Sequence, residues 1–233
     1  MLRRRLMKSG IPEGFVDLGL PSGTLWAKGN IVKNGSTYAI GEETDYGCYF
    51  SWGNIDGHNE GEGYNFNSNT YWSTAGGSLE ENIASDDADH DAALACLGSP
   101  WHLPTKENFK ELYDNTKREW TTINDVRGWK FMKKTDNSVY IFFPAAGVYI
   151  GTNVSSLNSH SYYWSSSIYD DDTYYVYIMY CDSSYVDYMV EEYRYNGISV
   201  RAVMSNGEGG KLTLFKRILN FFKSLVKKGG EVC

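Results

Sequence analysis

Tyrosine dominates one stretch of this chain and limits how that stretch can fold. Between Tyr162 and Asn196, eleven of the 35 positions are tyrosine, ten of the others are serine or aspartate, and none is lysine. Aromatic residues favour strands, whose side chains point alternately to two faces. The alternation predicts a strand with Val176 and Ile178 on one face. The other face, expected to be open, carries Tyr175, Tyr177 and Met179.

The composition of this stretch is typical of a binding surface. Antibody paratopes also combine tyrosine with small polar residues, because rigid amphipathic rings supply contact area at a low cost in entropy. A packed core would contain leucine, isoleucine and valine instead. The alternative is an ordinary tyrosine-rich sheet whose rings cover an underfilled core. The residues that we expect to contact a ligand are Tyr169, Asp170, Asp171, Asp172, Tyr175, Tyr177, Met179, Asp182, Tyr185, Asp187, Tyr188, Tyr193 and Tyr195.

The net charge of −7 over 233 residues is unevenly distributed. Residues 1–8 carry four basic side chains and residues 211–228 carry six without an acid, which leaves a net charge of −16 for residues 9–210. Such an acidic body disfavours the phosphates of nucleic acid as the main ligand. It favours a neutral, basic or protein partner.

Sequence periodicity predicts two helices followed by short strands. One helix is expected over Asp86–Leu97, beginning with acids and ending at Gly98. The second follows Thr105, a good N-cap, and places Phe109 and Leu112 on one face. Two helices with many short antiparallel strands in one domain predict an α+β fold. Strands are expected within residues 15–27, 128–134, 138–147 and 163–203, and long irregular loops within residues 41–77.

The predicted domain spans residues 15–204 and is flanked by two basic segments. Residues 1–14 form a lead-in, residues 205–210 a flexible linker, and residues 211–233 a tail with a basic amphipathic helix. Docking of this helix on its own domain, self-association into a homo-oligomer, and binding to a membrane surface or another partner stay open. The sequence shows neither a signal peptide nor a membrane-spanning apolar run, so we expect synthesis in the cytoplasm, with a place on a virion or membrane surface left open.

The sequence contains no recognisable motif of an enzyme or a metal site. Hydrolase, phosphate-binding, zinc-protease and dinucleotide signatures are absent, and the four cysteines lack metal-ligand spacing. His90 lies near Asp87, Asp89 and Asp91, which an exposed, acid-rich helix start explains. The consecutive carboxylates of residues 170–172 suit an exposed loop, with a shared cation such as calcium as the alternative. We therefore expect no catalysis, no cofactor and no metal.

Some large side chains are expected to serve the scaffold. Arg201 lies between Val200 and Ala202 on a segment that we expect to be buried. An unpaired buried guanidinium is costly, so this one should contact a carboxylate or several carbonyl groups. Tryptophan rings are expected to hold irregular loops in place, and the candidates are Trp26, Trp52, Trp101, Trp129 and Trp164.

Six segments resemble, in order, the Fibrobacter-type major paralogous domain that is widespread in Bacteroidetes. They are FVDLGLPSGTLWA (15–27), DYGCYFSWGN (45–54), DAALACLGSPWHLPTKENFKEL (91–112), FFPAAG (142–147), YYWSSS (162–167) and RYNGISVRAV (194–203). That domain is similar to the formylglycine-generating-enzyme type of C-type lectin fold, so the resemblance implies this fold for residues 15–203. The catalytic cysteine pair and the calcium-sugar motifs of such relatives have no counterpart here. Their absence disfavours an oxidase and calcium-dependent sugar binding.

Residues 163–203 further resemble the variable region of proteins that retroelements diversify in gut bacteria and their phages. In such proteins, mutation of adenine in template Asn codons gives Tyr, Asp, Ser, His, Thr or Ile at fixed positions. The resemblance implies a hypervariable ligand-binding protein that recognises a protein or glycan on a cell or virus surface. The alternatives are an assembly subunit of a phage or cell-surface particle, oligomerised through the tail, and a lectin-like oxidase. The scaffold positions expected not to vary are Trp164, Ser165, Ser166, Gly197, Ser199, Val200 and Arg201.

Overall fold

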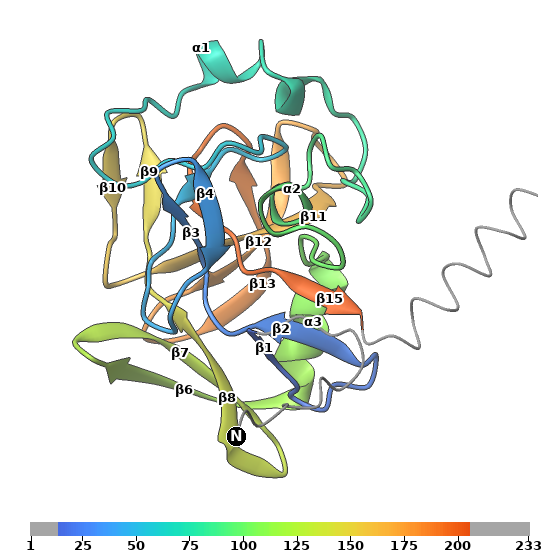
Figure 1. The fold of residues 1–233 in the computed structure, drawn as a ribbon, viewed down its shortest axis with the longest axis vertical. Helices are drawn as coiled ribbons and strands as arrows, with labels where there is room; N and C mark the ends of the chain where they lie inside the picture. Colours follow the sequence, from blue (N-terminus) through green and yellow to red (C-terminus); the bar gives the residue numbers. More distant parts are fainter. Residues whose placement is uncertain (1–13, 206–233) are drawn as a thin grey trace, which may run out of the picture.

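The computed structural model describes residues 14–205, and these are built mainly from β-strands (Figure 1). Strands make up 42% and helices 12%, arranged within this range as five sheets and three short α-helices. The prediction of an α+β, C-type lectin-like fold is therefore wrong. Many of the strands are only two to four residues long. Segments of that length are too short to show a periodic pattern, so the sequence understates the strand content.

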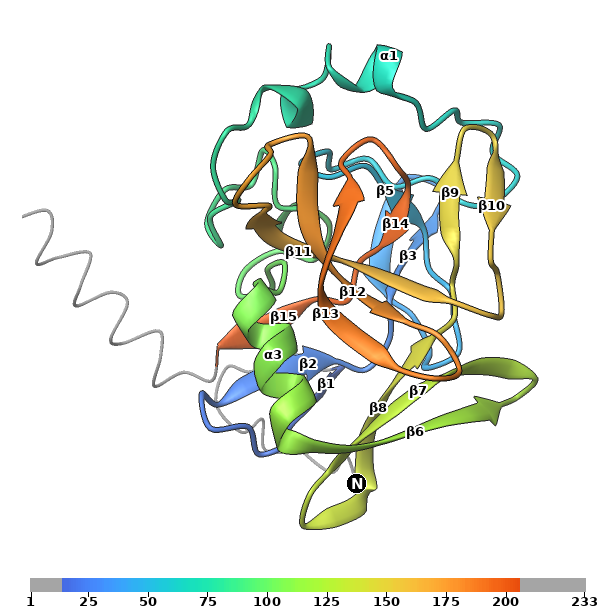
Figure 2. The same ribbon diagram turned by 180° about the vertical axis from the view of Figure 1, so that it is seen from behind.

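A five-stranded sheet forms the centre of the domain (Figure 2). In spatial order it contains β13 (Val186–Tyr193), β12 (Tyr175–Cys181), β11 (Ser161–Ile168), β14 (Ile198–Ser199) and β5 (Tyr49–Phe50). Neighbouring strands are antiparallel except β11 and β14, which are parallel. The strands expected within residues 163–203 are thus present, and they supply most of this sheet.

Three smaller sheets surround the central one. The first contains β1 (Phe15–Val16), β2 (Thr24–Ala27) and β15 (Val203–Ser205). The second pairs β3 (Ile31–Asn34) with β4 (Thr37–Ile40), and the third pairs β9 (Val148–Ile150) with β10 (Asn153–Ser155). Because β2 lies between β1 and β15, residues from both ends of the domain share one sheet.

The fifth sheet consists of two long hairpins. It contains β6 (Thr116–Ile123), β7 (Val126–Lys133) and β8 (Asp136–Pro144), in that order. Asn124 and Asp125 join β6 to β7 with φ of 48° and 64°, the left-handed conformation that two-residue hairpin turns require. In both views this sheet extends beyond the rest of the domain (Figures 1 and 2).

The longest helix, α3 (Lys106–Asn115), begins where the sequence predicts. The Thr105 hydroxyl accepts a hydrogen bond from the N–H of Asn108 at 3.2 Å, and the Asn108 side chain accepts one from the N–H of Thr105 at 2.9 Å. This reciprocal pair is a capping box in which asparagine stands where glutamate is usual. Phe109 and Leu112 are fully buried on one face of the helix, as predicted.

The other helix, α2 (Ala92–Leu97), is shorter than the prediction of Asp86–Leu97. Asp91 is its N-cap, and its carboxylate accepts hydrogen bonds from three backbone N–H groups, those of Ala93, Leu94 and Leu103. An N-cap residue has non-helical backbone angles, so the acids before Asp91 lie outside the helix. Two further single turns, α1 (Ser68–Tyr71) and η1 (Ala75–Ser78), interrupt the long loop after β5.

The central sheet has an apolar cluster on each face. Val176 and Ile178 of β12 belong to one cluster, and Met179 belongs to the other, so the predicted alternation along β12 is confirmed. The cluster around Met179 also contains Phe109 and Leu112 of α3, which contacts β11, β12 and β13. Of the tryptophans expected to hold loops, Trp26, Trp52, Trp101 and Trp164 are buried and Trp129 is partly exposed.

Arg201 is fully buried, and its partners are oxygen atoms of carbonyl and amide groups. The guanidinium donates hydrogen bonds to the carbonyl oxygens of Ala27 at 3.1 Å and Phe142 at 2.7 Å, and to Oδ1 of Asn30 at 2.9 Å. The prediction of several carbonyl partners is confirmed. One side chain therefore ties together the end of β2, the loop that follows it and β8.

Two predicted segments fall on the undescribed ends of the chain. Of the lead-in over residues 1–14 only Gly14 is described, and of the linker over residues 205–210 only Ser205. The tail over residues 211–233, with its predicted amphipathic helix, lies outside the described residues. Across residues 14–205, every helix is too short or too polar to cross a membrane.

We expect Arg201→Met to lower the free energy of unfolding by about 3 kcal/mol or more, because it leaves three buried oxygen acceptors without a donor. Urea denaturation measures this change. Arg127→Met is the matched control, since Arg127 is exposed, and it should stay within about 0.5 kcal/mol of the wild type. Equal stability of the two variants would contradict the structural role of Arg201.

Candidate binding surface

Helix α3 covers only part of the sheet face that carries Tyr175, Tyr177 and Met179. Its ten residues span about 15 Å, whereas the seven residues of β12 span about 23 Å. Met179 lies beneath the helix, in the cluster with Phe109. Lys106, the first residue of α3, has its ammonium nitrogen 4.2 Å from the ring centroid of Tyr177. Beyond that point the face is occupied by tyrosine.

These rings form a continuous series, called the tyrosine row below, that consists of Tyr169, Tyr175, Tyr177, Tyr193 and Tyr195. The ring centroids of Tyr177 and Tyr169 lie 5.2 Å apart, and those of Tyr169 and Tyr175 lie 6.4 Å apart. Tyr175 and Tyr193 are directly paired across β12 and β13, with centroids 4.6 Å apart. Tyr195 then stacks on Tyr193 at 5.0 Å. Three separate segments thus bring five rings together.

The exposure of this face differs from the prediction at two residues. Tyr177 is only 5% exposed and Met179 is fully buried, because α3 and its Lys106 side chain cover them. Both were expected to contact a ligand, and Met179 has no surface with which to do so. Tyr193 is 39% exposed, and Tyr169, Tyr175 and Tyr195 are partly exposed. Of the three β12 residues predicted on the open face, only Tyr175 therefore has substantial exposed surface.

Asp170 fixes the end of the row that meets α3. Its Oδ2 lies 3.0 Å from Nζ of Lys106 and accepts a hydrogen bond from the Tyr177 hydroxyl, also at 3.0 Å. The hydrogen bonds from Lys106 and Tyr177 hold the pKa of Asp170 below its ordinary value. Asp170 is thus ionised at neutral pH. Its carboxylate is already bound to Lys106 and Tyr177, and it positions these two side chains.

The neighbouring acids have partners of other kinds. Oδ1 of Asp172 accepts the N–H of Tyr174 at 2.8 Å, and Asp171 lies beside the hydroxyl of Tyr169. The three consecutive carboxylates therefore do not converge on one point as calcium ligands would. Within the described part of the chain, His, Cys, Asp and Glu side chains form no group of three or more arranged to hold a metal ion.

The remaining predicted contact residues lie in two separate groups. Tyr185, which is exposed, lies 5.6 Å from Tyr180 between ring centroids, and Oδ1 of Asp182 accepts the N–H of Tyr185 at 3.2 Å. Tyr188 packs instead against Tyr113 of α3 at 5.3 Å, and Asp187 is its neighbour on β13. The tyrosines predicted to contact a ligand are thus divided among the tyrosine row and two smaller aromatic groups.

Arg194 holds the backbone of the row in place, a role that sequence analysis missed. Although only 1% exposed, it donates hydrogen bonds to the carbonyl oxygens of Leu79 and Thr173 at 2.9 and 2.8 Å. It also bonds to Gly76 and lies 4.5 Å above the ring of Trp52. The available signal was a single basic residue within a stretch that otherwise contains none.

Strand β13 is the edge of the central sheet, and its own carboxylates occupy two of its backbone N–H groups. Asp187 accepts the N–H of Met189 at 2.8 Å through Oδ1, and Glu192 accepts the N–H of Tyr193 at 2.8 Å through Oε1. Unpaired edge groups are templates for another strand, and acids on an edge strand oppose such pairing. This edge therefore favours recognition through side chains over strand addition.

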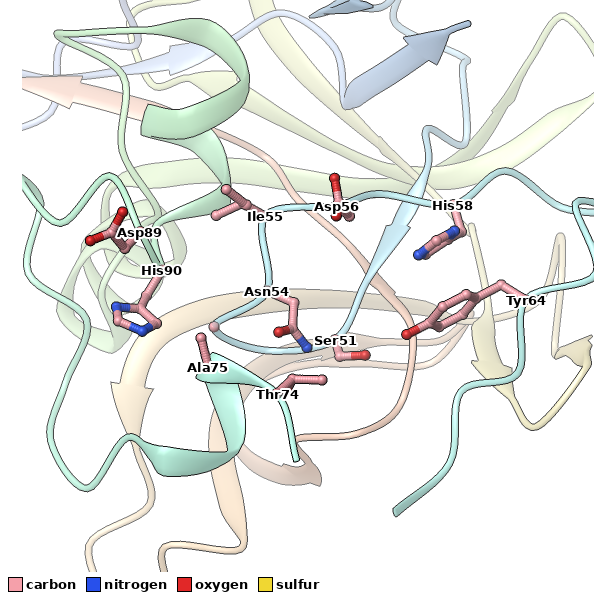
Figure 3. Close-up of a pocket in the computed structure, with 11 residues that line it drawn as sticks. Ser51, Asn54, Ile55, Asp56, His58, Tyr64, Thr74, Ala75, Asp89 and His90 are labelled. Carbon is pink, nitrogen blue, oxygen red and sulfur yellow. The ribbon is translucent and has the colours of Figure 1, made fainter. Parts of the chain in front are cut away.

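A separate pocket of about 590 Å³ lies beside the long loop after β5 (Figure 3). Asn54 and Tyr64 point toward its middle, and His58 stacks on Tyr64 with ring centroids 3.6 Å apart. Burial lowers the pKa of His58, so this imidazole is neutral at pH 7. His90 lies at the opposite end of the pocket, which means that the two imidazoles do not form an acid–base pair.

The acids around His90 behave differently from the prediction of an exposed group. Nδ1 of His90 lies 2.8 Å from Oδ2 of Asp87, so these two residues do meet. Asp91 is fully buried as the N-cap of α2. Only Asp89 matches the expectation of an exposed acid. The sequence pattern missed the buried position because an N-cap aspartate and a surface aspartate look alike.

Comparison with known proteins gives one match. The family model described as Domain of unknown function (DUF8237) matches residues 110–203, from within α3 to the first residue of β15. The matched segment includes the whole tyrosine row and both buried arginines. No curated protein and no solved structure matches the chain.

The contact between Tyr175 and Tyr193 predicts an unusual titration. A side-chain hydrogen bond to Tyr193 raises the pKa of Tyr175 to about 12 from the ordinary 10.0. Tyr193→Phe removes the hydroxyl that receives this bond, so the pKa of Tyr175 should fall toward 10.0. An NMR titration with ¹³C-labelled tyrosine measures it. Tyr185→Phe, in a different aromatic group, should leave the value unchanged, and an equal shift in both variants would exclude the pairwise bond.

Proposed function

We propose that this protein recognises a ligand with the tyrosine row and does so without catalysis. The observation that carries the proposal is the continuous contact of five rings past the end of α3, three of them partly exposed and Tyr193 exposed. Tyrosine rings offer a large contact area with few rotatable bonds, and their hydroxyls can meet a polar partner. Such a row suits binding to another surface.

The core of the sheet offers no better explanation for these rings. Met179, Phe109 and Leu112 are fully buried and fill the space between the sheet and α3. Tyr193 and Tyr195 lie outside that cluster. The rings therefore extend the surface beyond a core that is already complete, which argues against the alternative of tyrosines that cover an underfilled core.

We also propose that this surface is hypervariable, as in proteins diversified by retroelements. The positions expected to stay constant are buried without exception, and the expected contact positions have exposed surface except Tyr177 and Met179. Exposed side chains can be replaced without disturbing the buried residues that hold the fold, so this arrangement tolerates variation. The buried set is Trp164, Ser165, Ser166, Gly197, Ser199, Val200 and Arg201.

A protein or glycan on a cell or virus surface is the proposed kind of partner. Catalysis through cysteine is disfavoured because burial raises the pKa of Cys48 and of Cys96 to about 12, and a protonated thiol is a poor nucleophile. An assembly role through the tail involves residues outside the described range. The tyrosine row is the observation that favours recognition over these alternatives.

An array of cell-surface proteins and glycans tests the proposal. For a ligand that binds the wild type, Tyr175→Ala/Tyr193→Ala should weaken affinity about thirtyfold, since central aromatic residues of interfaces contribute about 2 kcal/mol or more. Tyr140→Ala is the control, because Tyr140 is a partly exposed tyrosine on β8. A ligand whose affinity depends on neither row residue would refute this binding surface.

The hypervariability has a separate test in the surrounding DNA. We expect a nearby template repeat that matches codons 163–203 and differs from them almost only where the template has adenine, together with a reverse transcriptase gene. Substitutions spread evenly over all four template bases, or no repeat, would reject diversification and leave an ordinary tyrosine-rich binding domain.

A further inference from the structure

The tyrosine row has a rim of acids without cationic partners. Asp171, Asp172 and Glu191 are all exposed, and none of them takes part in an ion pair among the described residues. Asp171 and Glu191 lie close enough to Tyr169 to raise the pKa of its hydroxyl, after the larger effect of desolvation. Asp172 lies close to Tyr175 in the same way. These carboxylates thus border the rings themselves.

The two cations near the row are already occupied. Lys106 is held by Asp170, with 3.0 Å between Nζ and Oδ2. Arg194 is buried and directed at backbone carbonyl groups. The rim acids therefore keep a negative field that the side chains of residues 14–205 do not neutralise. An anionic ligand is repelled from this surface, and a cationic one is attracted.

Lys106 makes, within the protein, the kind of contact that we expect a ligand to make with the rest of the row. Its ammonium group lies over the ring of Tyr177 and is paired with a carboxylate at the same time. Rings attract cations through their negative faces, and an arginine can add two parallel hydrogen bonds to a carboxylate. The exposed end of the row combines the same two elements, tyrosine rings and carboxylates, without the cation.

We propose that the partner of the tyrosine row is a basic protein segment, which places lysine or arginine side chains between the rings and the carboxylates of Asp171, Asp172 and Glu191. The inference rests on the proposed function and narrows it to a class of partner. The four rings of the row with exposed surface suit an extended segment with several contacts. Electrostatic attraction of this kind accelerates association and weakens as salt is added.

An array of random-sequence peptides grouped by net charge tests the inference on the full chain. The wild type should bind basic peptides about tenfold more strongly than neutral peptides with the same aromatic content, because a cation that lies on an aromatic ring and beside a carboxylate is attracted by both. Added salt should reduce this preference.

Two variants with the same change in charge identify the source of the preference. Asp171→Asn/Asp172→Asn/Glu191→Gln, which keeps every tyrosine, should lose it. Asp56→Asn/Glu60→Gln/Asp125→Asn neutralises three exposed acids on other loops and should keep it. Circular dichroism of both variants controls for folding.

The outcomes separate this inference from the proposed function. No preference for basic peptides, or an equal loss in both charge variants, overturns the inference. Retention of the preference in Tyr175→Ala/Tyr193→Ala also overturns it, since the acidic body alone would then be the cause. A neutral glycan whose affinity falls with the tyrosine variant but not with the rim variant overturns the basic partner and leaves the proposed function intact.

Discussion

A helix of ten residues cannot cover the whole face of the sheet on which it packs, and the exposure of the tyrosine row follows from that mismatch. Where α3 lies on β12, the sheet presents Met179 to Phe109 and Leu112 and forms an ordinary apolar core. Beyond Lys106, the first residue of α3, the same face must meet water. Tyrosine satisfies both conditions because its ring packs on neighbouring rings and its hydroxyl can hydrogen-bond to water or to a polar side chain. Lys106 and Asp170 mark the boundary between the two environments.

Two buried arginines hold separate segments of the domain together through hydrogen bonds to carbonyl and amide oxygens, without ion pairs to carboxylates of residues 14–205. Arg201 donates hydrogen bonds to oxygen atoms of β2, of the loop after it and of β8. Arg194 donates hydrogen bonds to oxygen atoms of the loop over residues 71–79 and of the turn before β12. A guanidinium suits this purpose because it offers five donors in a rigid plane. Hydrogen bonds thus hold long irregular segments that have few regular neighbours.

Local patterns in the sequence predicted those features that depend on neighbours along the chain. The alternation of Val176 and Ile178 with the other residues of β12, the N-cap of α3 at Thr105, and the carbonyl partners of Arg201 are confirmed. The fold class was wrong because two-residue strands such as β5 leave no periodicity. The open face was predicted to include Tyr177 and Met179, which are buried. They are covered by α3, a helix that lies some 70 residues earlier in the sequence. No local pattern contains that information.

The backbone of the tyrosine row is fixed by atoms that do not belong to its exposed side chains. Strand pairing sets the register of β12 and β13, and the guanidinium of Arg194 holds the turn before β12 through the carbonyl oxygen of Thr173. Replacing Tyr193 or Tyr195 alters neither set of bonds. If the row binds a ligand as proposed, a change of its exposed rings would alter the binding preference while leaving these backbone bonds in place, so that variants of the domain would differ in partner more than in stability.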